Sequence, residues 1–344
     1  MKVFIITEGG KNIGFGHITR CLSLYQAFEE KEIIPEFLLN SDDNIEYLLK
    51  GIKYQKSNWI EKRAKLFELI KGADIAIIDS YLADSSFYIQ ISNLVKIPVY
   101  IDDNKRLDYP DGVVLNGNIH AETLNYPKKN GVTYLLGTKY TPLRKEFWEV
   151  PEKKMKEKIE SIMVTFGGDD AKNITSKIMN LLNKEYQDLR KNIIIGKVFH
   201  NIEEIKKEID ENTNLIYCSD AGRIKEIMLE SDIAISAGGQ TLYELARVGV
   251  PTIGVCVADN QLGIIKEWGE IGFLEYAGWY NKNSIITSID KLLKHLENIE
   301  IRKSKSKAGR KFVNGKGSLN IVEILIEEKN EDSFFRRKFI KRTS

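Results

Sequence analysis

A glycine-rich stretch near the N-terminus constrains the fold of this chain more than any other feature. The apolar run 3–6 precedes it, residues 9–20 read Gly-Gly-Lys-Asn-Ile-Gly-Phe-Gly-His-Ile-Thr-Arg, and apolar residues then recur at helical spacing up to Phe28. This order predicts a buried strand, a glycine loop and a helix. Gly14 and Gly16 allow the loop to adopt positive φ and to approach a ligand closely.

The helix after this loop begins beside whatever the loop binds. Its unbonded N–H groups and positive dipole end favour an anion such as a phosphate. His17 stands at this junction, where an imidazole that titrates near neutral pH can act as a general base. A structural role is the commoner one for a single histidine, and both roles are open at this point. The other three histidines, His120, His200 and His295, lie in polar, loop-like or helical segments without obvious partners.

The length and charge of the chain narrow the class of protein. It has 344 residues and a formal net charge of +2, which favours two domains and gives no indication of nucleic-acid binding. Its 3 cysteines form no Cys-x-x-Cys pair, which argues against a disulfide framework or a zinc site. The first residues lack a signal-peptide pattern, and no apolar run approaches the roughly 20 residues that span a bilayer. We expect a soluble, cytoplasmic protein with domains at residues 1–150 and 151–330.

Strand and helix patterns alternate in the first half of the chain. Strands are expected at 35–39, 75–78 and 99–101, with helices at 60–71 and 85–95 and a short helix from Asp42 to Lys50. Continuous apolar strands separated by helices predict a parallel sheet covered on both faces. Polar residues follow two strands, as Asp79-Ser80-Tyr81 and Asp102-Asp103-Asn104, at the edge where such sheets bind ligands. We expect both clusters to meet His17; the alternatives are a helix cap for Asp79 and a turn at Asp102-Asp103.

The second half repeats this architecture. Strands are expected at 162–166, 193–195, 215–217, 233–235 and 251–257, helices at 174–182 and 242–248, and helical structure from there to about residue 329. Glycine pairs follow two of these strands, at Gly167-Gly168 and Gly238-Gly239. The pattern predicts two doubly wound α/β domains that face each other across a cleft. Glu244 lies one helical turn after Thr241 and could accept hydrogen bonds from ribose hydroxyls; the alternative is an ordinary surface glutamate.

The motifs of both halves, taken in order, resemble one known family. They are Gly14-Phe15-Gly16-His17-Ile18-Thr19-Arg20-Cys21, Asp79-Ser80-Tyr81, Leu135 to Tyr140 with Leu143-Arg144, Phe166-Gly167-Gly168-Asp169, Ser236 to Thr241 with Glu244, Asn260-Gln261, and Val313 to Gly317. The chain resembles the UDP-sugar hydrolase of pseudaminic acid biosynthesis and the related spore-coat polysaccharide proteins. This resemblance implies the GT-B fold, which MurG-type transferases share, and cleavage of UDP-2,4-diacetamido-2,4,6-trideoxy-β-L-altropyranose to UDP and free sugar without a metal or other cofactor.

The resemblance also implies roles for individual residues. His17 would be the general base that activates water, with inversion at the anomeric carbon, and the C-terminal domain would hold UDP. The expected substrate-binding residues are Gly14, Gly16, Arg20, Asp79, Tyr81, Gly168, Asp169, Gly238, Gly239, Gln240, Thr241, Glu244, Asn260 and Gln261.

One segment departs from the family pattern. The hydrolases usually carry Arg-x-Asp after the first strand, whereas this chain has Thr7-Glu8-Gly9-Gly10, which leaves the sugar open. Two other functions stay open as well: a GT-B glycosyltransferase that uses a UDP-sugar donor, and a nucleotide-sugar binding protein without catalysis.

The C-terminal tail, residues 331–344, lies beyond the resemblance. Aromatic and basic residues interleave in it between Phe334 and Arg342, a pattern that could attach weakly to an anionic membrane surface. The favoured alternative is a solvated terminus without a role, because chain ends are often loosely ordered.

Overall fold

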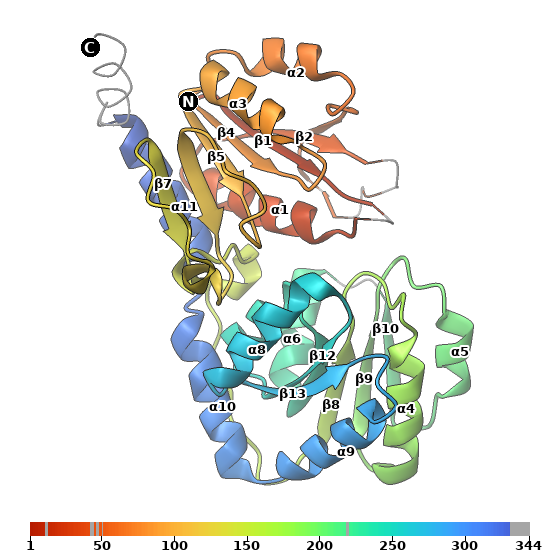
Figure 1. The fold of residues 1–344 in the computed structure, drawn as a ribbon. Helices are drawn as coiled ribbons and strands as arrows, with labels where there is room; N and C mark the ends of the chain where they lie inside the picture. The colour runs from red at the N-terminus through yellow and green to blue at the C-terminus, as the bar shows by residue number, and fades with distance from the viewer. Residues whose placement is uncertain (11–12, 42–44, 46–47, 50, 218–219, 331–344) are drawn as a thin grey trace. The chain divides into compact units, whose positions relative to one another are not determined.

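The computed structural model describes residues 1–10, 13–41, 45, 48–49, 51–217 and 220–330. The short helix expected from Asp42 to Lys50 lies largely outside these residues, and the C-terminal tail 331–344, with both of its alternatives, lies wholly outside them. The chain divides into two units, residues 1–145 with 316–344 and residues 146–315 (Figure 1). Each unit is a parallel sheet with helices on its faces.

The first unit contains a seven-stranded parallel sheet. Its strands in chain order are β1 (Val3–Glu8), β2 (Glu36–Asn40), β3 (Tyr54–Lys56), β4 (Ile75–Asp79), β5 (Ile97–Ile101), β6 (Gly112–Asn116) and β7 (Val132–Leu136). In space the order is β3-β2-β1-β4-β5-β6-β7. The direction of winding therefore reverses between β1 and β4, and ligands of doubly wound sheets bind at such a reversal, beyond the carboxyl ends of the strands.

Helices cover both faces of this sheet. They are α1 (Gly16–Glu29), α2 (Arg63–Ile70), α3 (Ser85–Leu94) and α11 (Gly317–Asn330), with short 3-10 helices η1 (Ala121–Leu124), η2 (Thr138–Tyr140) and, where the two units join, η3 (Lys145–Phe147). The apolar sides of α2 and α3 pack into one core with the strands, through Leu66 and Phe87 against Phe4 and Ile78. Burial of this apolar surface is the main force that holds the layers together.

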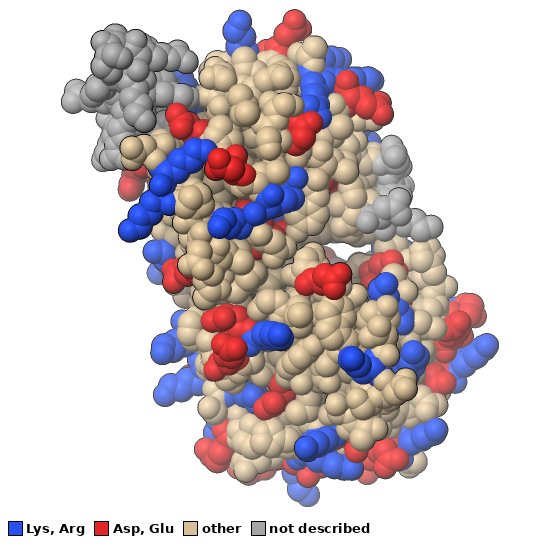
Figure 2. Space-filling model, in the orientation of Figure 1, with Lys and Arg blue, Asp and Glu red and all other residues tan. Residues whose placement is uncertain are grey.

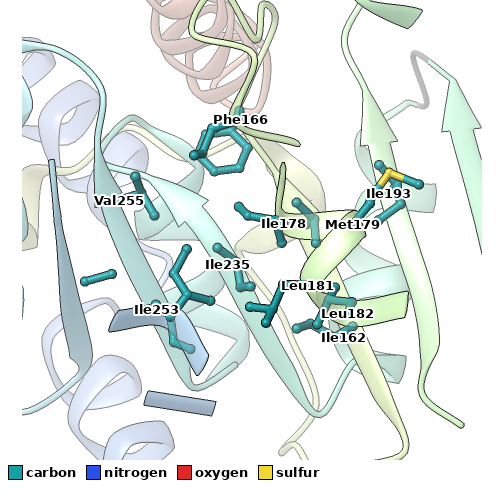
Figure 3. Close-up of a cluster of buried hydrophobic side chains, with 14 of the residues drawn as sticks. Ile162, Phe166, Ile178, Met179, Leu181, Leu182, Ile193, Ile235, Ile253 and Val255 are labelled. Atoms are coloured by element: carbon teal, nitrogen blue, oxygen red, sulfur yellow. The ribbon is translucent and has the colours of Figure 1, made fainter. Parts of the chain in front are cut away.

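The second unit contains a six-stranded parallel sheet in the order β10-β9-β8-β11-β12-β13. Its strands are β8 (Ser161–Thr165), β9 (Arg190–Ile195), β10 (Thr213–Tyr217), β11 (Ile233–Ala237), β12 (Thr252–Cys256) and β13 (Leu274–Trp279). Its helices are α4 (Ile174–Glu185), α5 (Ile202–Lys207), α6 (Ala221–Glu230), α7 (Thr241–Val248), α8 (Leu262–Glu270), α9 (Ile285–His295) and α10 (Ile299–Phe312), with the 3-10 helix η4 (Asp259–Gln261). Figure 3 shows how Ile178 and Leu182 of α4 pack against Ile162 and Ile235 of the sheet. Here the winding reverses between β8 and β11.

Two expectations about the C-terminal third need correction. Residues 274–279 form the edge strand β13 instead of helix, because they pair with β12 through a register shift at Gly254/Val255, and pairing with a distant segment is invisible in a local pattern. Residues 317–330, expected in the second domain, form α11 of the first unit. This helix packs against α1. Just after α1, Lys31 Nζ lies 2.9 Å from Glu323 Oε1, and Asn320 Nδ2 donates to the carbonyl of Lys139 at 2.9 Å.

Acidic and basic side chains are mixed on the face drawn in Figure 2, as the small net charge of +2 leads one to expect. Across the part of the chain that the structure describes, no helix has the length and apolar character needed to cross a membrane.

Candidate functional site

A glycine loop and a helix follow β1, as the sequence predicts, but of Gly14 and Gly16 only Gly14 has a positive φ. Gly10 and Gly14 exchange backbone hydrogen bonds of 3.1 and 2.7 Å, which close the loop. Gly14 adopts φ +83°, a conformation that strains any residue with a Cβ atom. Because α1 begins at Gly16, His17 is the second residue of the helix and lies at the winding reversal.

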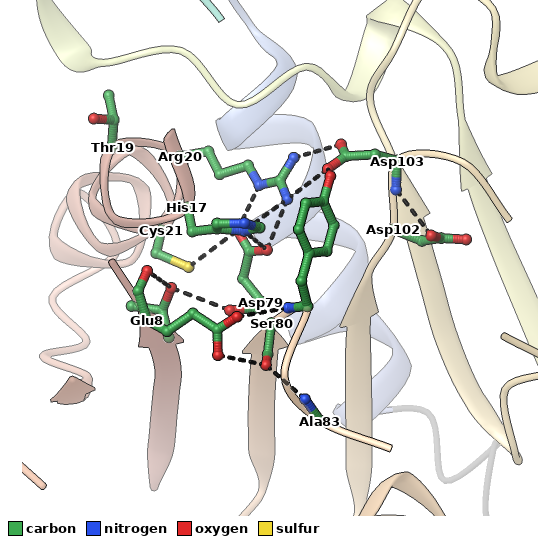
Figure 4. Close-up of polar contacts among 12 residues, drawn as sticks. Glu8, His17, Thr19, Arg20, Cys21, Asp79, Ser80, Ala83, Asp102 and Asp103 are labelled. Atoms are coloured by element: carbon green, nitrogen blue, oxygen red, sulfur yellow. Dashed lines mark hydrogen bonds and ion pairs between the residues drawn. The ribbon is translucent and has the colours of Figure 1, made fainter. Parts of the chain in front are cut away.

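His17 is held by Asp79, the last residue of β4. Its Nδ1 lies 2.6 Å from Asp79 Oδ1, and both side chains are buried (Figure 4). Burial alone would raise the pKa of Asp79, but the positive charge of Arg20 and the contact with His17 outweigh it and lower this pKa below its usual range. An ionised carboxylate can only accept hydrogen bonds, so Nδ1 carries the proton and donates it. The lone pair of the ring is then on Nε2, the nitrogen that can accept a proton from a reacting group.

Arg20 lies one turn after His17 on α1 and joins two carboxylates. Its Nε and Nη2 donate to Asp79 at 2.5 and 2.7 Å, and its Nη1 and Nη2 donate to Asp103 at 2.5 and 3.0 Å. Nη2 is also 3.1 Å from His17 Nδ1, but guanidinium has no acceptor and that nitrogen already donates to Asp79, so we assign no hydrogen bond there. Burial opposes the ionised form of Asp103, yet Arg20 and the hydroxyl of Tyr81 hold its pKa far below the usual range. Charge-assisted hydrogen bonds of this kind fix the rotamers of the side chains that they join: His17, Arg20, Asp79 and Asp103.

Tyr81 and Asn118 complete the cluster around Asp103. The Tyr81 hydroxyl donates to Asp103 Oδ2 at 2.5 Å, and Asn118 Nδ2 donates to Asp103 Oδ1 at 2.9 Å. The rings of Tyr81 and His17 meet edge to face with centroids 4.6 Å apart. The expected convergence of strand-end residues on His17 therefore holds for Asp79, Tyr81 and Asp103.

The sequence left a helix cap open for Asp79 and a turn open for Asp102-Asp103; the structure excludes the first and shows the second. Asp79 caps no helix; Asp84 caps α3 and accepts from the N–H of Phe87 at 2.8 Å. Asp102 does form a turn, since its Oδ1 accepts from the N–H of Asp103 and Arg106 at 2.9 and 3.2 Å. Asp103, the next residue, points to Arg20 instead.

Three residues near this cluster were not singled out from the sequence as site residues. Asn118 and His120 follow β6, and Glu8 ends β1. His120 is buried, its Nδ1 has no hydrogen-bond partner within the described residues, and burial lowers its pKa in spite of the nearby charge of Asp103. No local pattern marks Asn118 or His120. Glu8 could have been noticed in the sequence, because it lies in the segment 7–10, which differs from the Arg-x-Asp pattern of the hydrolases that the chain resembles.

The glycine pairs of the second unit follow β8 and β11, the strands between which its winding reverses. Gln261 Oε1 accepts from the N–H of Gly238 at 3.2 Å and of Val257 at 3.3 Å, and so ties two strand ends together. A Cβ on Gly238 would lie 2.7 Å from Ile265, so this position needs glycine, whereas one on Gly239 would meet nothing within 4 Å. Gly239 is thus the open glycine of the pair.

The remaining expected site residues lie at the same edge of the second sheet. Glu244 is buried in the first turn of α7, so its interpretation as an ordinary surface glutamate is wrong. Gly168 is exposed and Asp169 half-buried in the turn after β8, and the next residue, Asp170, caps α4 through the N–H of Thr175 at 2.9 Å. Of the others, Gln240 directly precedes α7, Thr241 is the first residue of that helix, and Asn260 lies within η4. Within the described ranges, no group of three or more His, Cys, Asp or Glu side chains is arranged to hold a metal ion.

Comparison with known proteins finds relatives over most of the chain, two of them named for UDP-sugar hydrolysis or for polysaccharide biosynthesis. No family model matches the chain. It is 28% identical over 276 residues to the uncharacterised protein MJ1062 of Methanocaldococcus jannaschii, covering 74% of this chain and about half (55%) of that relative. It is 27% identical to the UDP-2,4-diacetamido-2,4,6-trideoxy-β-L-altropyranose hydrolase of Campylobacter jejuni, over 76% of this chain and 93% of that protein. It is 24% identical to the spore coat polysaccharide biosynthesis protein SpsG of Bacillus subtilis, over 94% of this chain and 98% of that protein.

The chain is thus similar over most of its length to a hydrolase of this kind and to SpsG. Its fold is similar to that of MurG from Acinetobacter baumannii, with a TM-score of 0.65 and 14% identity over 95% of this chain and 100% of that one. The complex of Staphylococcus aureus MnaA with UDP gives a TM-score of 0.67 and 15% identity over 94% of this chain and 95% of that one. The expected GT-B fold of two doubly wound, Rossmann-like domains is thereby confirmed.

Proposed function

We propose that this protein is a UDP-sugar hydrolase that releases UDP and the free sugar by attack of water on the anomeric carbon. The single observation that carries the proposal is the buried hydrogen bond of 2.6 Å between Asp79 and His17 at the end of the glycine loop. The names of relatives in Campylobacter jejuni and Bacillus subtilis supply the substrate class, a UDP-activated deoxysugar of surface-polysaccharide or pseudaminic-type biosynthesis.

In this mechanism His17 takes the proton of the attacking water on Nε2. Asp79 keeps Nδ1 protonated and stabilises the imidazolium that forms, which suits general-base catalysis worth about 10²–10⁴-fold in rate. Arg20 holds Asp79 ionised but is itself bound to two carboxylates, so we assign it a positioning role. Water that attacks opposite UDP would invert the configuration at the anomeric carbon.

The leaving diphosphate needs donors that stabilise its charge. Backbone N–H groups in the loops after β8 and β11, with the N-terminus of α7, are of the kind that binds phosphate. In this proposal Gly168, Gly239, Gln240 and Thr241 lie beside the nucleotide, and Glu244 accepts hydrogen bonds from its ribose. Asp169 and Asn260 are proposed contacts of the same ligand.

A GT-B glycosyltransferase is the second candidate, favoured by the similarity of the fold to MurG. In it, the same His17 would take the proton of an acceptor hydroxyl instead of water.

One assay separates the two candidates. The purified protein is incubated with the UDP-activated 2,4-diacetamido sugar and no acceptor, and free UDP is measured over many turnovers. A hydrolase releases UDP catalytically, and the anomer first formed, observed by proton NMR, has inverted configuration. A transferase releases UDP only when an acceptor is added. If no UDP is released with or without an acceptor, but calorimetry shows that the UDP-sugar binds, the protein is a binding protein without catalysis.

A further inference from the structure

Glu8 ends β1 beside the glycine loop, and its side chain is completely buried. None of the contacts described for His17 and Arg20 involves it. Its carboxylate turns instead to the segment that follows β4. Oε1 accepts from the backbone N–H of Tyr81 at 2.7 Å and of Leu82 at 3.1 Å, and Oε2 accepts from the Ser80 hydroxyl at 2.6 Å (Figure 4).

Ser80 extends this set of bonds by one step. Its Oγ accepts from the N–H of Leu82 at 3.0 Å and of Ala83 at 2.9 Å. The backbone N–H groups of three successive residues beyond β4 are thus bonded by only two side chains, Glu8 and Ser80. Glu8→Gln replaces one of the two carboxylate oxygens by an NH₂ group, so either the Ser80 hydroxyl or the backbone N–H of Tyr81 faces a donor in place of its acceptor. The segment can relieve this only by moving.

Tyr81 is the residue that such a movement would displace. Its backbone N–H donates to Glu8, its hydroxyl donates to Asp103, and its ring packs nearly perpendicular to the His17 ring. The residue is 39% exposed, so it also forms part of the accessible surface next to the histidine. Its placement is therefore fixed from two ends, by two carboxylates on different strand ends.

We infer that Glu8 is a positioning residue that sets Tyr81 against His17 and Asp103 through the backbone of residues 80–82. This gives a physical role to Glu8, which lies in the segment 7–10 that differs from the hydrolase pattern the sequence otherwise resembles. The kinetic consequence rests on the proposed hydrolase function, but the placement of Tyr81 does not. The two are therefore tested by separate readouts.

The placement is tested by NMR of the His17 ring protons. A tyrosine ring whose centroid lies 4.6 Å from that of the imidazole shifts these resonances. The chain has four histidines, so the loss of one set of signals in His17→Asn assigns those of His17. In Tyr81→Leu the ring effect is lost. We expect Glu8→Gln to move the His17 resonances toward their Tyr81→Leu positions, and to move them no further in the Tyr81→Leu background.

Two more variants make this test decisive. Ser80→Ala removes the second side chain that binds the backbone of this segment, and it should shift the His17 resonances in the same direction. It therefore replaces Glu8→Gln as the test if that variant fails to fold. Glu36→Gln, an exposed carboxylate at the start of β2, is the matched control and should change nothing. Wild-type His17 resonances in folded Glu8→Gln, or in Ser80→Ala if Glu8→Gln does not fold, would overturn the inference. The inference would also be overturned if Glu8→Gln shifted the His17 resonances by the same amount in the wild-type and in the Tyr81→Leu background.

The kinetic arm measures UDP release. A displacement of about 1 Å near a reacting group costs on the order of 10²-fold in rate, so Glu8→Gln should lower kcat by roughly 10- to 100-fold with a smaller change in KM. The loss should be much smaller in the Tyr81→Leu background, because the two residues act together. If wild type releases no UDP, the proposed hydrolase function fails while the NMR result still decides the role of Glu8. A full kcat loss that persists in Tyr81→Leu would contradict positioning through Tyr81.

Discussion

Asp79 Oδ1 and His17 Nδ1 lie 2.6 Å apart although 62 residues separate them in the chain. The same carboxylate also receives two hydrogens from Arg20, so three N–H donors converge on it, beside the Cys21 thiol, whose Sγ lies 3.7 Å from Oδ2. This arrangement requires the ionised form of Asp79, and that form determines the tautomer of His17.

Asp79→Asn tests the tautomer directly. An amide offers one oxygen, and if that oxygen stays on Arg20 Nε, the NH₂ group faces His17 Nδ1. Nδ1 then becomes an acceptor and the proton moves to Nε2, which can no longer act as a base. We expect kcat for UDP release to fall by about 10²–10⁴-fold, with UDP affinity unchanged in calorimetry. Asp84→Asn, at the cap of α3, is the control and should keep full activity. A kcat within threefold of wild type would mean that Asp79 has only a structural role.

His17→Asn tests the base itself. Asparagine keeps some hydrogen bonding but accepts no proton near neutral pH, so UDP-sugar binding should persist while turnover is lost. The measurements are calorimetry with the UDP-sugar and the rate of UDP release. More than about a tenth of the wild-type kcat in this variant would exclude general-base catalysis by His17.

The local half of this site could be predicted from the sequence. Strand, glycine loop and helix are neighbours in the chain, so His17, Arg20 and the open loop could be identified from residues 9–20. Asp79 and Tyr81 could be proposed as well, because they follow a continuous apolar run.

The other half depends on contacts between distant segments. That β1 pairs with β4, which brings Asp79 to His17, follows from the winding of the sheet and has no local signature. The bonds of Asn118 to Asp103 and of Glu8 to Tyr81 likewise join strand ends that only the sheet brings together. The same physics explains β13 and α11, whose assignments require partners far away in the sequence.

Glu244→Ala tests the nucleotide side. If the buried carboxylate accepts hydrogen bonds from ribose hydroxyls, its loss should cost roughly 1.5–3 kcal/mol, or about 10- to 100-fold in Kd for UDP. Its effect on kcat at saturating substrate should be smaller. Calorimetry with UDP is the measurement, and Glu226→Ala on the exposed side of α6 is the matched control. Unchanged UDP affinity in a variant that melts like wild type would place the ribose contact elsewhere.

Asp103→Asn tests the electrostatics of the Arg20 cluster through pH. The folded-state pKa of Asp103 lies far below its unfolded value of about 3.9, so the folded protein binds fewer protons than the unfolded chain below roughly pH 5. The resulting stabilisation is complete above the unfolded pKa of Asp103 and is lost as the pH falls toward its folded pKa.

An asparagine at position 103 has no such proton to bind. The variant should therefore be less stable than wild type at pH 7, by about 1–3 kcal/mol for the lost charged hydrogen bonds, and this difference should shrink as the pH falls below about 4. Urea unfolding between pH 3 and 7, followed by circular dichroism, measures both effects. Asp108→Asn, which removes an exposed carboxylate paired with Lys129, should match wild type at every pH. A stability difference between Asp103→Asn and wild type that stays constant down to pH 3 would show that the carboxylate charge contributes nothing to the cluster.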